Sequence, residues 1–202
     1  MGNVDSREQC VVEREAKAQT VFADELALIH TPEIQRFVLS VFGNLCPDYF
    51  WVIPASSSGR LHSPDETGIG GLVVHTKRAV QWAVQLQQMF ASASDISLDE
   101  TVAALLLHDM MKRGQTKTEE ETFASHANAV SQHGIYCSQQ IIASGVFPED
   151  APWAKRIIEA VRDHMGRWTH HPGKSDTEFL NEMEQSSLFV HVCDYCASRR
   201  IV

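Results

Sequence analysis

An apolar run that ends in adjacent imidazole and carboxylate side chains constrains this chain more than any other feature. Leu105-Leu106-Leu107 leads directly into His108 and Asp109, and Lys112 follows three residues after Asp109. Burying such a polar pair is costly unless something neutralises its charge. A divalent metal ion would do so, because both side chains can reach one ion from the same helical turn, and the carboxylate has a second oxygen for a second ion. The alternative is a helix end at which His108 and Lys112 only complement the helix dipole.

Length and composition fit one globular domain. The chain has 202 residues, 44% of them hydrophobic, which is enough for a sizeable core. Its formal net charge of −9 argues against a broad nucleic-acid-binding face, although bound metal ions would still attract a small anionic substrate. The five cysteines are odd in number and scattered, so a reducing cytoplasmic location is expected rather than a disulfide framework. No apolar run in the sequence is long enough to span a membrane.

Apolar residues recur at helical spacing along most of the chain, and alternating strand patterns are few. The sequence therefore predicts an all-α, bundle-like domain over residues 31–202, preceded by an N-terminal helical extension over residues 1–30. The extension is expected to form one helix over about 6–29. Caps, first-turn prolines and apolar periodicity predict further helices that begin near Pro32, Gly71, Ser97, Ser125, Pro152 and Gln185.

Two stretches, residues 47–71 and 167–177, interrupt the helical pattern. Long loops in a compact domain are usually functional or disordered, so both are expected to be active-site loops. Arg60 and His62 in the first loop are suited to face a phosphate, and a tryptophan, either Trp51 in the first loop or Trp168 in the second, is suited to stack on a base. The alternatives are a polar surface loop for the first pair and ordinary packing for the tryptophan.

Further histidines and acids lie on the inward faces or at the ends of other predicted helices. His75 falls in the apolar stripe of the helix from Gly71, and Asp194 lies on the inward side of the last helix, where a buried carboxylate needs a partner. His164 ends the helix from Pro152, and His126 or His133 adds another imidazole. Imidazole and carboxylate ligands together suit Mn, Fe, Co, Ni or Zn. A single histidine has an ordinary core interpretation, but the ordered set is difficult to explain as core filling.

This set resembles the signature of the HD-domain superfamily of metal-dependent phosphohydrolases, which is His…His-Asp…Asp on an all-helical core. The segments that carry the resemblance are residues 70–76, 108–112, 164–168 and 191–199. The resemblance implies that a first metal ion is bound by His75, His108, Asp109 and Asp194. It also implies that Asp109 bridges to a second ion held with His164 and with His126 or His133. His126 is preferred of these two, because it stands at the predicted helix start.

The resemblance implies hydrolysis of a small-molecule phosphate ester, with a nucleotide as the leading candidate, by a water activated on one or two divalent ions. Asp109 and Lys112 are expected to be catalytic. Lys112 matches a lysine that often follows the His-Asp pair, and Arg60, His62 and Arg167 are expected to help it bind the substrate phosphate. The alternatives are a di-iron oxygenase with the same ligands and a relaxase-like domain for single-stranded DNA, which the acidic composition disfavours.

Overall fold

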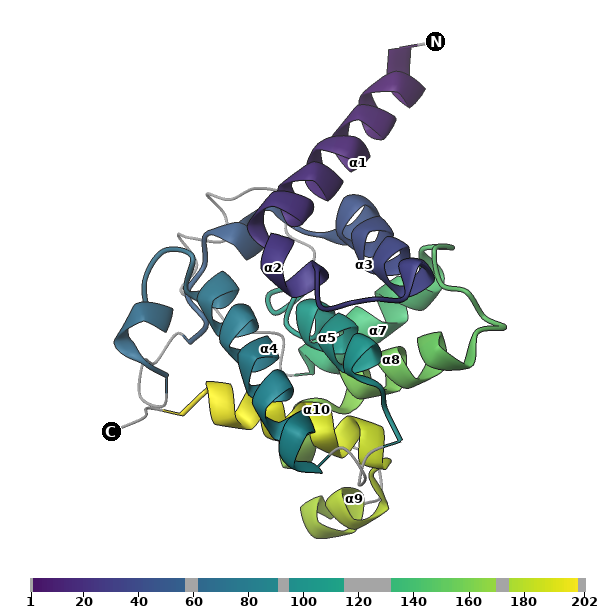
Figure 1. The fold of residues 1–202 in the computed structure, drawn as a ribbon. Helices are drawn as coiled ribbons and strands as arrows, with labels where there is room; N and C mark the ends of the chain where they lie inside the picture. Colours follow the sequence, from purple (N-terminus) through teal and green to yellow (C-terminus); the bar gives the residue numbers. More distant parts are fainter. Residues whose placement is uncertain (1, 57–61, 91–94, 115–131, 170–174, 200–202) are drawn as a thin grey trace.

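The computed structural model of the protein describes residues 2–56, 62–90, 95–114, 132–169 and 175–199 (Figure 1). Every regular element within these ranges is helical, so the predicted all-α class is confirmed. In chain order, with η for a short 3-10 helix, the elements are α1 (Gly2–Val21), α2 (Ala23–Leu26), α3 (Pro32–Leu45), η1 (Asp48–Trp51), η2 (Pro64–Glu66), α4 (Gly71–Phe90), α5 (Leu98–Leu107), α7 (His133–Ala143), α8 (Pro152–Asp163), η3 (Gly166–Trp168), α9 (Asp176–Glu182) and α10 (Gln185–Ala197).

Helix α5 forms the centre of the bundle. It packs against α3, α4, α8 and α10, and Figure 1 shows these helices around it. All its residues from Glu100 to Leu107 are buried, and a helix that is apolar on every side requires such a position. The predicted capping box starts it, since the Ser97 hydroxyl accepts a hydrogen bond from the Glu100 backbone N–H and the Glu100 carboxylate accepts one from Ser97 N–H. The apolar run therefore carries His108 and Asp109 into the interior.

The N-terminal segment is divided into two helices rather than one. Phe22 separates α1 from α2 and has φ −107° and ψ 30°, outside helical geometry. Its ring is fully buried against Phe42, Phe50 and Trp51, with ring centroids 5.6–6.2 Å apart, so packing of this aromatic side chain explains the break. Helix α1 packs on α3, with Val11 and Glu15 against Gly43, and the N-terminal end of α1 projects away from the bundle in Figure 1.

The helix predicted from Ser125 to Ser144 is interrupted at Gln132. Helix α7 begins at His133, because Gln132 has φ −135° and ψ 50° and interrupts helical geometry. Residues 115–131, which include Ser125, lie outside the described residues. The predicted loop over residues 47–71 contains η1 and η2, and its aromatic start, Tyr49–Trp51, is buried in the core. Among the described helices, none combines the length and apolar character needed to cross a bilayer.

Candidate metal centre

The ends of three helices and the inner faces of two others meet at one buried cluster of histidines and carboxylates. His75 lies in the first turns of α4, His133 begins α7, and Asp194 lies on α10. His108 and Asp109 follow α5, and His164 follows α8. All are buried except Asp194, whose side chain is 20% exposed. The structure therefore brings together every metal-ligand candidate of the sequence that lies among the described residues.

The rings of His108 and His164 are oriented by the same kind of local contact with the backbone. The Nδ1 atom of each lies within hydrogen-bond distance of the carbonyl oxygen three residues earlier, 2.6 Å from Leu105 O and 2.7 Å from Val161 O. A neutral ring that donates from Nδ1 keeps a lone pair on Nε2, where it can bind a metal. The Nε2 atom of His108 is buried and has no hydrogen-bond partner in the described part of the chain. Such an orphaned nitrogen fits a metal ligand, because buried polar atoms otherwise find partners.

A first set of donor atoms comes from His75, His108 and Asp194. The Oδ1 atom of Asp194 lies 2.9 Å from His75 Nε2 and 3.6 Å from His108 Nε2. Ligands at about 2.1 Å from one ion lie about 3.0–3.4 Å from each other in octahedral or tetrahedral geometry, which follows from ordinary zinc–ligand distances. The three donors all lie within 4.8 Å of one another. Their chemistry and spacing therefore fit one divalent transition-metal ion after small side-chain adjustments.

A second set of donor atoms comes from Asp109, His133 and His164. Asp109 Oδ1 lies 2.7 Å from His133 Nε2 and 3.6 Å from His164 Nε2, and these two nitrogens are 3.1 Å apart. The other carboxylate oxygen, Oδ2, lies 3.6 Å from His108 Nε2 and 3.8 Å from His75 Nε2. The two oxygens of Asp109 therefore face the two donor sets, which is the position of a bridging ligand.

Gly134 makes the approach of His133 possible. A Cβ atom at this position would lie 2.7 Å from both Val161 O and Arg162 O, and 2.9 Å from His164 Nδ1. Only a glycine permits helix α7 to cross the end of α8 this closely. The contact between the two helices therefore sets the distance between His133 and His164.

The carboxylates of the cluster are ionised and their charge is compensated. Burial by itself would raise the pKa of Asp109, but Lys112, His108 and His133 hold it well below its usual range. Lys112 Nζ lies 2.5 Å from Asp109 Oδ2. Burial would also lower the pKa of His75, but the carboxylates of Asp194 and Glu66 raise it to about 9. The Lys112 ammonium beside Asp109 and the protonated His75 ring beside Asp194 thus supply positive charge that these buried carboxylates need.

A cavity of about 250 Å³ opens beside the cluster. Lys112 and His62, both predicted to bind substrate, line it, whereas Arg167 does not. The Arg167 guanidinium instead stacks on the Trp168 ring, 4.4 Å from its centroid. Arg60 and His126 lie outside the described residues. The full lining is His62, His75, Asp109, Lys112, His133, His164, Met165, Trp168, His191, Asp194, Tyr195, Ser198 and Arg199.

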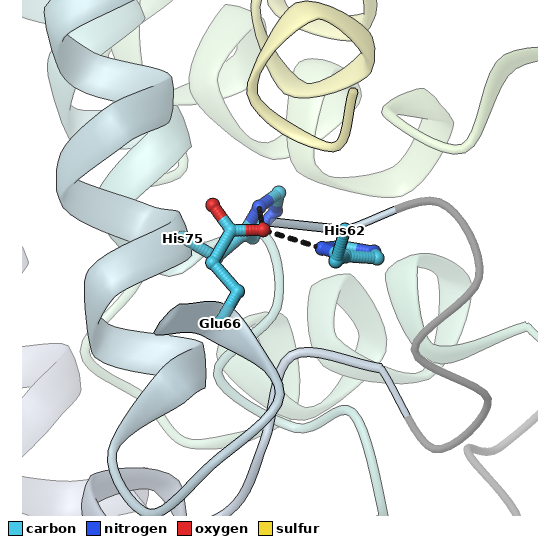
Figure 2. Close-up of side chains that lie close together, drawn as sticks. All are labelled: His62, Glu66 and His75. Carbon is cyan, nitrogen blue, oxygen red and sulfur yellow. Dashed lines mark hydrogen bonds and ion pairs between the residues drawn. The ribbon is translucent and has the colours of Figure 1, made fainter. Parts of the chain in front are cut away.

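The sequence interpretation gave no role to two residues of this region. His191 lines the cavity. Its Nδ1 atom lies 2.7 Å from His164 O, and this contact stabilises the segment that follows α8. Its helical spacing from Asp194 was the available signal. Glu66 is fully buried behind His75, 2.7 Å from His62 Nδ1 (Figure 2). It belongs to an irregular segment, where no periodicity indicates which side chains are buried.

Comparison with known protein families places this cluster in context. The family model described as HD domain matches residues 72–199, more than half of the chain and all of the segment from His75 to Asp194. Comparisons with curated proteins and with solved structures gave no match. Members of the matched family are metal-dependent phosphohydrolases with an all-helical core. The extent of the match, the all-α fold and the histidine–aspartate cluster together show that the chain belongs to the HD-domain superfamily of metal-dependent phosphohydrolases.

Proposed function

We propose that this protein hydrolyses a phosphate ester of a small molecule, with a nucleotide as the leading candidate substrate. The observation that carries the proposal is the position of Asp109. One carboxylate oxygen faces His133 and His164, and the other faces the set formed around Asp194. The ammonium group of Lys112 lies beside the same carboxylate and lines the cavity. A bridging carboxylate, with an ammonium group that both pairs with it and lines the cavity, suits the binding of a phosphate group.

Each ligand has a role in this proposal. His75, His108 and Asp194 would hold a first divalent ion, His133 and His164 a second, and Asp109 would bind both. Bound there, the ions would polarise the phosphoryl group and supply a nucleophile at neutral pH by lowering the pKa of a water towards ~7. The backbone carbonyls behind His108 and His164 would keep both rings oriented during turnover.

The remaining cavity residues would bind and orient the ester. Lys112 would meet a phosphate oxygen once metal ions, rather than this lysine, neutralise Asp109. His62 lies on the cavity wall and is the candidate to hold a proton near the leaving oxygen. Trp168 and Tyr195 are 42% and 43% exposed and line the cavity, so they offer aromatic surface on which a base can stack. This aromatic surface is what favours a nucleotide.

The test is metal reconstitution followed by a substrate screen. Protein stripped of metal is reloaded with Mn²⁺, Fe²⁺, Co²⁺, Ni²⁺ or Zn²⁺, and phosphate release is measured on nucleoside phosphates and on phosphate esters without a base. The proposal predicts metal-dependent phosphate release, faster on esters that carry a base. Oxygen consumption with two irons and no phosphate release would instead establish the oxygenase alternative, and inactivity on every ester would contradict the proposal.

A further inference from the structure

Glu66 is a fully buried carboxylate that belongs to neither donor set. It ends η2, and Figure 2 shows its carboxylate between the rings of His62 and His75. Its Oε2 atom lies 2.7 Å from His62 Nδ1 and 3.8 Å from His75 Nδ1. Burying an ionised carboxylate is costly, so its contacts need an explanation beyond general packing.

The surroundings of Glu66 do not suit a third metal ion. His62, Glu66 and His75 offer three donor atoms within 4.8 Å. However, the Arg78 guanidinium donates a hydrogen bond to Glu66 Oε1 and another, 2.7 Å long, to Asp65 Oδ2. A guanidinium already neutralises this carboxylate, and it would repel a cation bound beside it. The Glu66 carboxylate is therefore placed to accept hydrogen bonds rather than to bind an ion.

His75 lacks the support that the other histidines have. Its Nε2 atom faces Asp194, whereas its Nδ1 atom is buried without a hydrogen-bond partner among the described residues. His108 and His164 follow the ends of helices and use a backbone carbonyl three residues back. His75 lies inside α4, so it needs a side-chain acceptor. Metal-binding histidines almost always donate their second ring N–H to a carboxylate, a carbonyl or a water.

The backbone holds Glu66 against α4 at this position. Its carbonyl oxygen accepts a 2.9 Å hydrogen bond from Ala55 N–H. A Cβ atom on Gly71, the first residue of α4, would lie 2.1 Å from the same oxygen. Only a glycine permits η2 to pack so closely on the start of the helix that carries His75. The carboxylate therefore has little freedom to move away from the histidine.

We propose that Glu66 is a positioning residue for the metal centre. It accepts a hydrogen bond from His75 Nδ1–H once Nε2 binds metal, and this bond fixes the ring with Nε2 towards the first donor set. The same oxygen orients His62 on the cavity wall. The inference rests on the proposed metal site, because without an ion at His75 Nε2 there is nothing to position.

The test uses Co²⁺, whose visible absorption reports ligand geometry, titrated into metal-stripped protein. The variants are Glu66→Ala and Glu66→Gln, and Asp65→Asn is the matched control because Asp65 also binds Arg78 but is exposed. Glu66→Ala should weaken Co²⁺ binding by about 10–100-fold, as for other residues that support a metal ligand. Its spectrum should change too. Glu66→Gln should show a smaller loss of the same kind, and Asp65→Asn should match the wild type.

The outcomes separate this inference from the proposed function. If the wild type binds no Co²⁺, the proposed metal site is contradicted, and the proposed role of Glu66 is contradicted as well. If the wild type binds Co²⁺ and folded Glu66→Gln has the same affinity and spectrum, only the role of Glu66 is contradicted. Should Glu66→Ala fail to fold, Glu66→Gln decides, since it keeps the size of the side chain. Circular dichroism at the assay temperature establishes folding for each variant.

Discussion

The Nε2 atom of His133 lies 2.7 Å from Oδ1 of Asp109, on the opposite side of that carboxylate from the donor set around Asp194. His126, which helix position alone favoured, lies outside the described residues. We therefore expect His133, together with His164, to complete the second metal site. The expected result is that His133→Ala binds one ion per chain fewer than the wild type while retaining the first.

Two other histidines serve as comparisons for this variant. His30, whose side chain is 81% exposed, is a matched control, and His30→Ala should keep full metal content. His126→Ala should keep it as well. Elemental analysis of the three reconstituted variants measures the difference. Loss of an ion from His126→Ala but not from His133→Ala would restore the assignment that the sequence favoured.

Alanine variants of Asp109 and Lys112 are expected to differ in the property they lose. Asp109→Ala removes the bridging carboxylate, so metal and activity should be lost together. Lys112 cannot ligate a metal as an ammonium, so Lys112→Ala should keep its metal and lose turnover by about 10²–10³-fold, as when one preorganised donor is removed. Metal content and phosphate release are measured side by side. Lys155, which is exposed on α8 and does not line the cavity, provides the control Lys155→Ala. If Lys112→Ala is fully active, the proposed role of Lys112 in binding the substrate phosphate is contradicted, and its only role is the ion pair with Asp109.

Metal affinity should depend on pH through His75. The carboxylates around this ring raise its pKa from 6.5 to about 9, so in the metal-free protein a proton occupies it at neutral pH. An ion that binds Nε2 must displace that proton. Affinity for Co²⁺ should therefore rise between pH 7 and about 9 and then level off. Calorimetric titration in two buffers of different ionisation enthalpy should show proton release below that pH. A flat affinity profile with no proton release would contradict the protonated state of His75.

The raised pKa also affects folding in the absence of metal. A group whose pKa is higher in the folded state stabilises that state below its unfolded value, here 6.5, and this contribution is lost as pH rises through about 9. The metal-free protein should therefore melt at a lower temperature at pH 9 than at pH 6.5 when its thermal denaturation is followed at both pH values. Bound metal replaces the proton on His75, so the melting temperature of the metal-loaded protein should change less between pH 6.5 and pH 9.

Gly134→Ala tests the close crossing of α7 and α8. The added methyl group would meet two backbone carbonyls at 2.7 Å, which cannot move away as a flexible side chain would. The expected cost is about 1–3 kcal/mol, as for other overpacked sites, together with weaker binding of the second ion because His133 is displaced. Gly68→Ala is the control, since nothing lies within 4 Å of its Cβ position. Thermal melts and metal titrations of both variants provide the measurement, and equal stability would contradict the packing argument.

Features that depend on helical periodicity were predictable from the sequence. The apolar run predicted that His108 and Asp109 enter the interior, and Ser97 and Pro152 correctly marked helix starts. The apolar stripe of α4 likewise placed His75 on a buried face. These features are local, because capping groups and side-chain spacing along one helix determine them.

Features that depend on contacts between distant segments were not predictable. The proximity of His133 to His164 requires the crossing of α7 and α8 at Gly134, which no local pattern encodes. Glu66 is buried because η2 packs on the start of α4 and Arg78 neutralises its charge. In each case the partner lies on another element or in an irregular segment.

The number of transition-metal ions per chain tests the central claim most directly. Metal-stripped wild-type protein is reconstituted with Mn²⁺ or Co²⁺, freed of excess ion and analysed for metal, and its melting temperature is recorded with and without the ion. Two ions per chain and a higher melting temperature are expected, because an ion that binds only the folded state stabilises it. Asp109→Ala should retain neither effect, whereas Asp150→Ala, at an exposed aspartate, should retain both. Wild-type protein that holds no ion and gains no stability from Mn²⁺, Fe²⁺, Co²⁺, Ni²⁺ or Zn²⁺ would contradict the account.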